Sequence, residues 1–419
     1  MERVIFHVDA NSAFLSWTAV YRKKVLGQSL DLRDIPSAVA GSKENRQGVI
    51  LAKSMPAKKR GVRTGEPIFK ALQKCPDLVL VPPDYGLYVE ASRHFTALLR
   101  EFSPLVEQYS IDEAWVDMTG TEGLYGTPCA AAELIRQRIN DELGFTVNIG
   151  ISSNKLLAKM AGDFEKPNKI HTLYPWEMEK KLWPLPVREL FMVGPATEKK
   201  LNLLGIRTIG ELAKADPAMI LRKLHKPGLA LWHSANGRYS DLLAPQPEAN
   251  KGYGNSTTLP ADVTDSLSAY KVLLSLCETV GMRMRRDKKA ARCLSVSLRS
   301  SQFADFSHQM TLPVGTSNTE ELFQYACRIF DEAWDQVTPL RQLGVHATRL
   351  EEQGLRQYDL FSVENPGEYE KKARLDNTID DLREKYGEGI LRRARFVGSE
   401  TVLAGGLSKE RRTGITKPV

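Results

Sequence analysis

Two adjacent carboxylates interrupt an otherwise strand-like stretch, YSIDEAWVD, at residues 109–117. Side chains alternate between the two faces of a strand, so Asp112 and Glu113 would point in opposite directions. Burying two neighbouring negative charges is costly unless a positive charge compensates them. Any fold of this chain must therefore expose the pair in a surface hairpin or place it beside a cation. Taken alone, the stretch favours the hairpin.

A third carboxylate, Asp9, ends a strand predicted over residues 4–11, VIFHVDAN, whose apolar face is formed by Val4, Phe6 and Val8. Other elements are expected in the first 170 residues: helices over 12–25, 85–103, 127–143 and 154–164, and strands over 36–41, 48–54 and 144–152. The pattern indicates one sheet-centred unit, with Asp9 on one strand and the acidic pair on another.

The composition is that of a globular chain. With 419 residues, the length indicates about three domains, and 42% apolar against 26% charged residues argues against disorder. The five cysteines are scattered and never form a C-x-x-C pair, which favours a reduced cytoplasmic protein without a zinc site. We expect neither a signal peptide nor a membrane-spanning segment.

Positive charge is concentrated in two places on a chain of net charge +7. Residues 43–70 contain eight Lys or Arg against two acids, and residues 281–299 contain seven against Asp287 alone. Such clusters either face solvent or bind a polyanion such as nucleic acid. The counts alone leave both interpretations open.

Residues 175–243 are expected to be helical, and the segment LFMVGPATEKKLNLLGIRTIGELAKA at 190–215 has the pattern of a helix–hairpin–helix. It predicts a helix, a tight Gly194-Pro195 turn and a second helix from Thr197. The backbone N–H groups of such a turn bind DNA phosphates without reading bases. An ordinary helical hairpin is the alternative. A Pro- and Gly-rich linker is expected at 244–256.

Residues 257–352 predict a small sheet with two helices on one face. The expected helices cover 265–288 and 318–335, and the expected strands cover 293–301, 306–314 and 341–350.

Five segments, taken in order, resemble the Y-family translesion DNA polymerases, in particular the bacterial DNA polymerase IV branch. They are HVDANSAF, YSIDEAWVD, GISSNKLLAK, KPN and VGPATEKKLNLLGI. The resemblance implies an α+β multidomain, right-hand polymerase. Its parts would be a palm (1–30 and 75–170), small fingers (31–74), a helix–hairpin–helix thumb (175–243), the linker (244–256), an α/β little finger (257–352), and a clamp-binding peptide, helix and basic tail (353–419).

The resemblance gives the carboxylates a role, because the family holds two Mg²⁺ ions with such a set and Mn²⁺ can substitute. Asp9 and Asp112 would be shared ligands, Glu113 would complete the metal beside the primer terminus, and the Val8 carbonyl would serve the nucleotide-side metal. Two hard cations about 3.5–4 Å apart can flank an in-line phosphoryl transfer. The implied function is template-directed addition of deoxynucleotides to a primer 3′ end, with low-fidelity bypass of damaged template and no proofreading.

Hydrophobic residues would shape the nucleotide site. Phe14 occupies the family's steric-gate position, where an aromatic ring excludes a 2′-hydroxyl; the alternative is a core phenylalanine on a helical stripe. Val49 and Leu51 fall where residues of the fingers roof the nascent base pair.

Two lysines, Lys58 and Lys166, are implied to bind the triphosphate. Lys166 matches the family's lysine, whereas Lys58 stands where an arginine is usual and so lacks the bidentate fork. Met55 replaces the usual tyrosine, and we assign it no phosphate role.

Further residues are expected to bind macromolecules. The DNA-backbone contacts would come from Gly194, Ala196, Arg283, Arg285, Arg286, Lys288, Lys289 and Arg299. A QYDLF peptide at 357–361 fits a sliding-clamp ligand, with Gln357, Leu360 and Phe361 as its anchors. A helical stripe of Leu375, Ile379, Leu382, Tyr386 and Ile390 is expected to be packed, and the basic tail from about Gly405 to be a weak DNA tether or disordered.

Primer–template DNA, a deoxynucleoside triphosphate and the clamp are thus the expected partners of a monomer. Two alternative classes of protein are left open by the sequence: a metal-dependent nuclease, which also uses paired metals, and a non-catalytic DNA-binding relative. The gate, the triphosphate lysines and the clamp peptide argue against the nuclease. The presence of Asp9, Asp112 and Glu113 argues against the non-catalytic relative.

Overall fold

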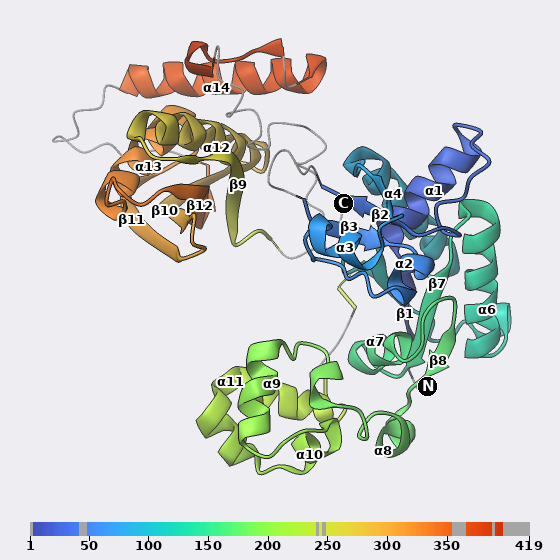
Figure 1. The fold of residues 1–419 in the computed structure, drawn as a ribbon. Coiled ribbons are helices and arrows are strands. Elements are labelled where there is room, and N and C mark those ends of the chain that lie inside the picture. The colour runs from blue at the N-terminus through green and yellow to red at the C-terminus, as the bar shows by residue number, and fades with distance from the viewer. Residues whose placement is uncertain are drawn as a thin grey trace. The chain divides into compact units, whose positions relative to one another are not determined.

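The structure, a computed structural model, describes residues 3–41, 48–239, 243–244, 249–353, 366–387 and 390–396. Two compact units are present, the first formed mainly by residues 1–39 and 50–247 and the second mainly by residues 248–413. Figure 1 shows their elements, and each unit is described by itself. In the described residues, no helix is long and apolar enough to cross a membrane. All five cysteines are free thiols.

A five-stranded sheet forms the centre of the first unit, with the strand order β5-β6-β1-β7-β8. The strands are β1 (Ile5–Ala10), β5 (Val106–Gln108), β6 (Glu113–Asp117), β7 (Val147–Ser152) and β8 (Ile170–Thr172). Strand β1 pairs antiparallel with both β6 and β7. The strand predictions at 4–11 and 144–152 are confirmed, whereas β5 and β8 were not predicted.

The alternation of β1 separates a core face from a polar face. Phe6 and Val8 pack into a large apolar cluster with α1 (Ala13–Lys24), α4 (Tyr85–Phe102) and α6 (Pro128–Arg138). Ile5 instead contacts a small cluster that includes Trp115 and a residue of α7 (Lys155–Asp163). By alternation, His7 and Asp9 share the face of Ile5. The five-stranded sheet thus places His7 and Asp9 on the face that the main apolar core does not use.

Helix α7 approaches β7 very closely at Gly150. A Cβ atom at this position would lie 1.9 Å from the Ala158 carbonyl oxygen, so only glycine fits. This contact seats α7, and the lysines that it carries, beside the acidic face of the sheet. The remaining short helices of this region are α5 (Glu122–Tyr125) and the π-helix η1 (Ile139–Leu143), which ends the helix expected over 127–143.

The fingers region contains a three-stranded sheet with the order β3-β2-β4. Its elements are β2 (Ser37–Ala40), β3 (Ile50–Lys53), α2 (Met55–Lys59), α3 (Ile68–Lys74) and β4 (Val79–Val81). The two predicted strands are confirmed. Ser54 caps α2, because its side chain accepts a hydrogen bond from the Ala57 backbone N–H at 3.2 Å.

Short helices build the thumb region. They are η2 (Pro175–Glu177), α8 (Met178–Lys181), η3 (Val187–Glu189), α9 (Pro195–Leu203), α10 (Ile209–Lys214) and α11 (Pro217–Ala235), which breaks at His225. The hairpin prediction was wrong in detail. A one-turn 3₁₀ helix, not an α-helix, lies before the turn, and α9 starts at Pro195, because proline is favoured in a first helical turn.

The second unit contains a four-stranded antiparallel sheet with the order β11-β10-β12-β9. Its strands are β9 (Gly252–Val263), β10 (Lys289–Ser300), β11 (Asp305–Thr316) and β12 (Leu340–Glu352). Helices α12 (Ser266–Arg286) and α13 (Thr319–Ala333) pack against it in one apolar cluster (Figure 1). Strand β9 was missed, and it begins inside the predicted linker because Tyr253 packs into this core.

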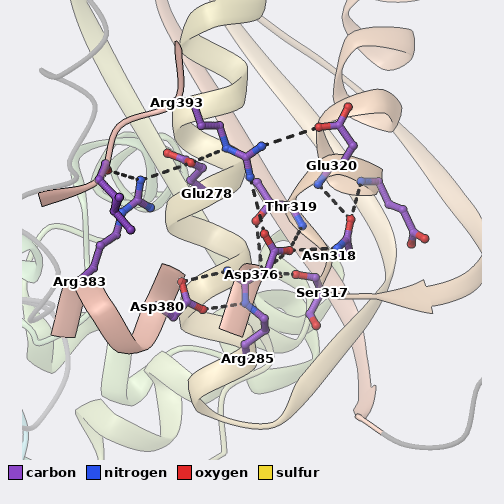
Figure 2. A network of polar contacts seen from close by, with 12 residues as sticks. Glu278, Arg285, Ser317, Asn318, Thr319, Glu320, Asp376, Asp380, Arg383 and Arg393 are labelled. Carbon is purple, nitrogen blue, oxygen red and sulfur yellow. Dashed lines mark hydrogen bonds and ion pairs between the residues drawn. The ribbon is translucent and has the colours of Figure 1, made fainter. Parts of the chain in front are cut away.

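Helix α14 (Pro366–Tyr386) packs on the second unit through charged residues, and the 3₁₀ helix η5 (Ala394–Phe396) follows it. Asp376 and Arg383 are buried, with 4% and 5% of their surface exposed, whereas Leu375 and Tyr386 are more than half exposed. The prediction of a packed apolar stripe was therefore wrong. Figure 2 shows the polar network around α14. Asp376 contacts Arg285 and the start of α13, and Arg383 pairs with Glu278.

Candidate active site and DNA-binding surfaces

The palm sheet brings the three predicted carboxylates together. Asp9, near the end of β1, lies directly opposite Glu113, the first residue of β6. Asp112 lies in the tight turn before β6, not in the strand, and its carbonyl oxygen accepts a hydrogen bond from the Ala10 N–H at 3.0 Å. Because Asp112 lies outside the strand, strand alternation does not force the side chains of Asp112 and Glu113 to opposite faces of the sheet.

Burial disfavours the charged form of two of these acids. Asp9 is 8% exposed, and burial raises its pKa, although the ammonium group of Lys166 pairs with it and opposes the shift. Burial also raises the pKa of Asp112, whose Oδ1 accepts a hydrogen bond from Ser110 Oγ at 2.6 Å. Both carboxylates would gain from a nearby cation.

Glu113 lies in a different environment. Burial opposes its ionisation, but the hydrogen bond with His7 and the charge of Lys159 outweigh burial and lower its pKa to about 2. His7 Nε2 lies 3.1 Å from Glu113 Oε2, and Lys159 forms an ion pair with the same oxygen. The Lys159 ammonium also lies 5.3 Å from the ring centroid of Tyr109. The sequence prediction did not include His7 or Lys159.

The donor set fits a hard divalent cation, because carboxylate and carbonyl oxygens are the ligands that Mg²⁺ prefers. Asp9 and Asp112 line one cavity, and Glu113 lies across the β1–β6 pair from Asp9. In the described ranges, no three His, Cys, Asp or Glu side chains are already grouped as a metal site. Asp9 and Glu113 are instead paired with Lys166 and Lys159, which supply the compensating positive charge.

The cavity has a volume of about 290 Å³ and joins the palm to the fingers. Its lining contains Asp9, Asp112, Phe14, Leu51, Lys53, Met55, Lys58, Thr64 and Lys166. The predicted gate, the two triphosphate lysines and one of the two roof residues therefore surround the same space as two of the acids. Val49 is 36% exposed and is not among the described residues that line the cavity. Lys53 and Thr64 were not predicted.

Phe14 lines this cavity, and it is also a partly buried residue that packs against the apolar clusters beneath it. It stacks on Tyr88, with the ring centroids 4.4 Å apart and the planes 4° from parallel. Thr18 and Tyr88 hydrogen-bond at 3.0 Å, which fixes the ring beneath Phe14. A stacked, half-buried phenylalanine is a rigid wall, as a steric gate requires.

The thumb turn presents open backbone at Gly194, the N-cap residue of α9. A Cβ atom built there would meet nothing within 4 Å. Ala196 is the second residue of the same helix. Both positions remain candidates for phosphate contact.

The predicted basic surface of the second unit divides into exposed and paired residues. Lys288 is exposed, and Arg286 is exposed while it also pairs with Asp287, at 3.3 Å. Lys289 pairs with Glu352, and Arg299 pairs with Asp305. Arg283 is partly buried, and its Nη1 donates a hydrogen bond to the Gly254 carbonyl oxygen at 3.1 Å.

The position of Arg285 contradicts its predicted role as a contact to the DNA backbone. Its side chain is only 6% exposed, and its Nε lies 2.7 Å from Asp380 Oδ2 (Figure 2). Its Nη1 lies 3.2 Å from Asp376 Oδ2 and donates to the Ser317 carbonyl oxygen at 2.6 Å. A guanidinium with these partners holds α14 and is not available to contact DNA.

The candidate clamp anchors, Gln357, Leu360 and Phe361, lie outside the described residues, as does the basic tail.

Family models match three parts of the chain. The impB/mucB/samB family matches residues 8–163, the C-terminal domain of that family matches 250–360, and the IMS family HHH motif matches 177–206. The last range contains η3 and α9, where the sequence predicted a phosphate-binding hairpin.

Similar proteins are named DNA polymerase IV. The chain is 43% identical to one from Clostridium acetobutylicum, over 96% of this chain and 100% of the relative. It is 37% identical to one from Alkaliphilus oremlandii, over 95% and 100%, and 36% identical to DNA polymerase IV 2 of Bacillus subtilis, over 94% of each chain.

A solved structure shares the fold. It is a Y-family DNA polymerase chimera, Dbh-Dpo4(243-245)-Dbh, with a TM-score of 0.69 and 24% identity, covering 83% of this chain and 98% of the chimera. The right-hand architecture expected from the sequence is thus confirmed. With near full-length relatives above 30% identity, the chain belongs to the Y-family of DNA polymerases, in the DNA polymerase IV branch.

Proposed function

We propose that the protein extends a primer 3′ end on a DNA template by two-metal phosphoryl transfer, and that it copies damaged template at low fidelity without proofreading. One observation carries the proposal: Asp9, Asp112, Phe14 and Lys166 line a single cavity at the junction of palm and fingers. Such a reaction needs carboxylates, a gate and a triphosphate-binding lysine in one place, and the third carboxylate, Glu113, lies opposite Asp9 on the neighbouring strand.

Asp9 and Asp112 would hold both metal ions, and Glu113 would complete the ion beside the primer terminus. The predicted Val8 ligand is not retained, because Val8 is fully buried between β6 and β7 and is not among the described residues that line the cavity. When bound, two Mg²⁺ ions, or Mn²⁺ in their place, lower the pKa of the primer hydroxyl and neutralise charge that develops on the triphosphate. His7 and Lys159 fix the orientation of Glu113. Lys166, now paired with Asp9, is placed to exchange that carboxylate for a phosphate oxygen.

Phe14 would select the sugar. Its ring is held against Tyr88, so it cannot move aside without breaking the stack. Leu51, which lines the same cavity, would contact the nascent base pair.

DNA would be held by its backbone. Gly194 and Ala196, at the start of α9, would contact the backbone of one DNA strand. The exposed side chains of Arg286 and Lys288 would contribute positive charge on the second unit. Such contacts position the duplex without reading its sequence. The QYDLF peptide would dock on the sliding clamp, and the protein would act as a cytoplasmic monomer.

Primer extension tests the proposal. Asp9→Ala and Asp112→Ala should each abolish nucleotide addition while DNA affinity stays within about twofold, because neither residue lies on the proposed DNA surfaces. Ser110→Ala is a matched control in the same turn, since it removes two hydrogen bonds between Ser110 and Asp112 and no metal ligand. A nuclease would shorten the labelled primer, and a non-catalytic relative would leave it unchanged. Extension within tenfold of wild type in either Asp variant would contradict the metal assignment.

A further inference from the structure

An unassigned lysine, Lys53, lines the same cavity. It is the last residue of β3, whose burial alternates: Ile50 and Ala52 are buried, and Leu51 and Lys53 are partly exposed. Residues two apart in a strand share a face. Lys53 therefore lies on the cavity side with Leu51, about 6.6 Å further along the strand at about 3.3 Å per residue.

The cation is held in place but is not neutralised. Lys53 Nζ donates a hydrogen bond to Thr64 Oγ1 at 3.0 Å, and Thr64 also lines the cavity. Among the described residues, neither Lys53 nor Lys58 has an ion-pair partner. The nearest acid that affects Lys53, Glu66, is bound by Lys74 at 2.5 Å.

Positive charge therefore exceeds negative charge on this side of the cavity. Burial, followed by the neighbouring charge of Lys58, lowers the pKa of Lys53. Two ammonium groups without an ion-pair partner repel each other, and an anion placed between them would attract both. Across the cavity, Lys166 already has Asp9 as its partner.

We propose that Lys53 binds the β- and γ-phosphate oxygens of the incoming nucleotide, together with Lys58. The inference rests on the proposed polymerase function and extends its triphosphate site. With Leu51 against the base, Lys53 lies further along the same wall, where the phosphates of that nucleotide would follow. Met55 also lines the cavity but has no charged group, so Lys53 and Lys58 are the cationic residues of β3 and α2 that line this cavity. Thr64 is a positioning residue that orients the Lys53 ammonium group.

Single-turnover incorporation of one matched nucleotide tests the inference. Lys53→Met should raise the apparent Kd of the dNTP about tenfold, with the maximal rate and DNA affinity within about twofold of wild type. Lys53→Arg should recover most of the affinity. Thr64→Val should raise the Kd about two- to threefold. Lys59→Met is the matched control, because Lys59 is exposed and does not line the cavity, and it should leave the Kd unchanged.

Inhibition by inorganic tripolyphosphate gives a second readout that involves neither base nor sugar. Lys53→Met should weaken this inhibition about as much as it weakens dNTP binding. An unchanged dNTP Kd or an unchanged tripolyphosphate inhibition would overturn the inference. If Asp9→Ala is inactive while Lys53→Met is unaffected, only this inference fails; if Asp9→Ala still extends primers, the proposed function fails.

Discussion

Arg285 and Arg286 are neighbours in sequence, and the structure predicts opposite consequences for their replacement. The Arg285 side chain is 6% exposed and bound to two aspartates, whereas the Arg286 side chain is 68% exposed. Arg285→Met should therefore destabilise the second unit and leave DNA binding largely unchanged. Arg286→Met should weaken DNA binding and leave stability largely unchanged. Each variant removes one charge, so each is the control for the other.

The contacts set the magnitude for Arg285→Met. Asp380 would lose both of its guanidinium contacts, at 2.7 and 3.2 Å, and Asp376 would lose one at 3.2 Å. Asp376 keeps the Thr319 N–H at 2.8 Å and the Asn318 amide at 3.0 Å, so the loss is partial there. Breaking a buried ion pair costs about 3–5 kcal/mol. For a unit of this size, that corresponds to a fall in Tm of about 6–20 °C.

Three measurements separate the two arginines. Thermal unfolding gives the stability, hydrogen exchange over residues 366–387 reports whether α14 stays docked, and DNA affinity at several salt concentrations gives the number of phosphate contacts. Arg286→Met should reduce the salt slope by about one unit and shift stability by less than about 0.5 kcal/mol. The reasoning is refuted if Arg285→Met lowers the salt slope while α14 remains protected, because its guanidinium would then face DNA.

Three further predictions concern the gate, the clamp peptide and acid stability. Phe14→Ala should lower discrimination against a matched ribonucleotide more than tenfold, or about 1.4 kcal/mol in transition-state energy; a smaller change in the dNTP-to-rNTP ratio would make Phe14 a packing residue. Replacing Leu360 and Phe361 with Ala should abolish stimulation by the clamp without altering distributive synthesis, and persisting stimulation would place the docking site elsewhere. Glu113 has a pKa lowered from 4.5 to about 2. Its ionised form therefore contributes up to about 3 kcal/mol to the free energy of unfolding above pH 4.5, and this contribution is lost as pH falls toward 2. In urea unfolding without metal, the free energy of unfolding should decline less steeply between pH 5 and 3 for Glu113→Gln than for the wild type.

Much of the palm could be predicted because its signals are local. Residues 4–11 and 144–152 each have the local pattern of a strand, and the metal-binding role of Asp9, Asp112 and Glu113 follows from the resemblance. Strand β9 was missed because its first residues, with glycines at 252 and 254, lie in the segment 244–256 that was predicted to be a linker. Its identity as a strand comes from pairing with β12, from Thr348↔Gly252 to Leu340↔Val263, which is a non-local interaction.

The lysines around the acids were missed for a related reason. Lys159 lies in a helix with no local sign that its ammonium group reaches Glu113, which is 46 residues earlier in the chain. Lys53 had a local signal, because it stands two residues after Leu51 on a predicted strand. The periodicity predicts that Lys53 shares a face with Leu51, but only the cavity shows which other residues line the same space.

Helix α14 contains two competing stripes, offset by one residue. Leu375, Ile379, Leu382 and Tyr386 repeat with helical spacing, and so do Asp376, Asp380 and Arg383. The hydrophobic effect alone favours burying the first stripe. The second is buried because Arg285 and Glu278 on α12 present matching charges, although Glu278 Oε2 and Arg383 Nε remain buried without a hydrogen-bond partner among the described residues. An interface of this kind contributes little net stability but penalises any other register strongly, because a shifted helix would leave the charges of Arg285 and Glu278 buried and unpaired. The charged stripe therefore specifies where α14 docks, and it makes Arg285 a structural residue within a segment whose composition resembles a DNA-binding patch.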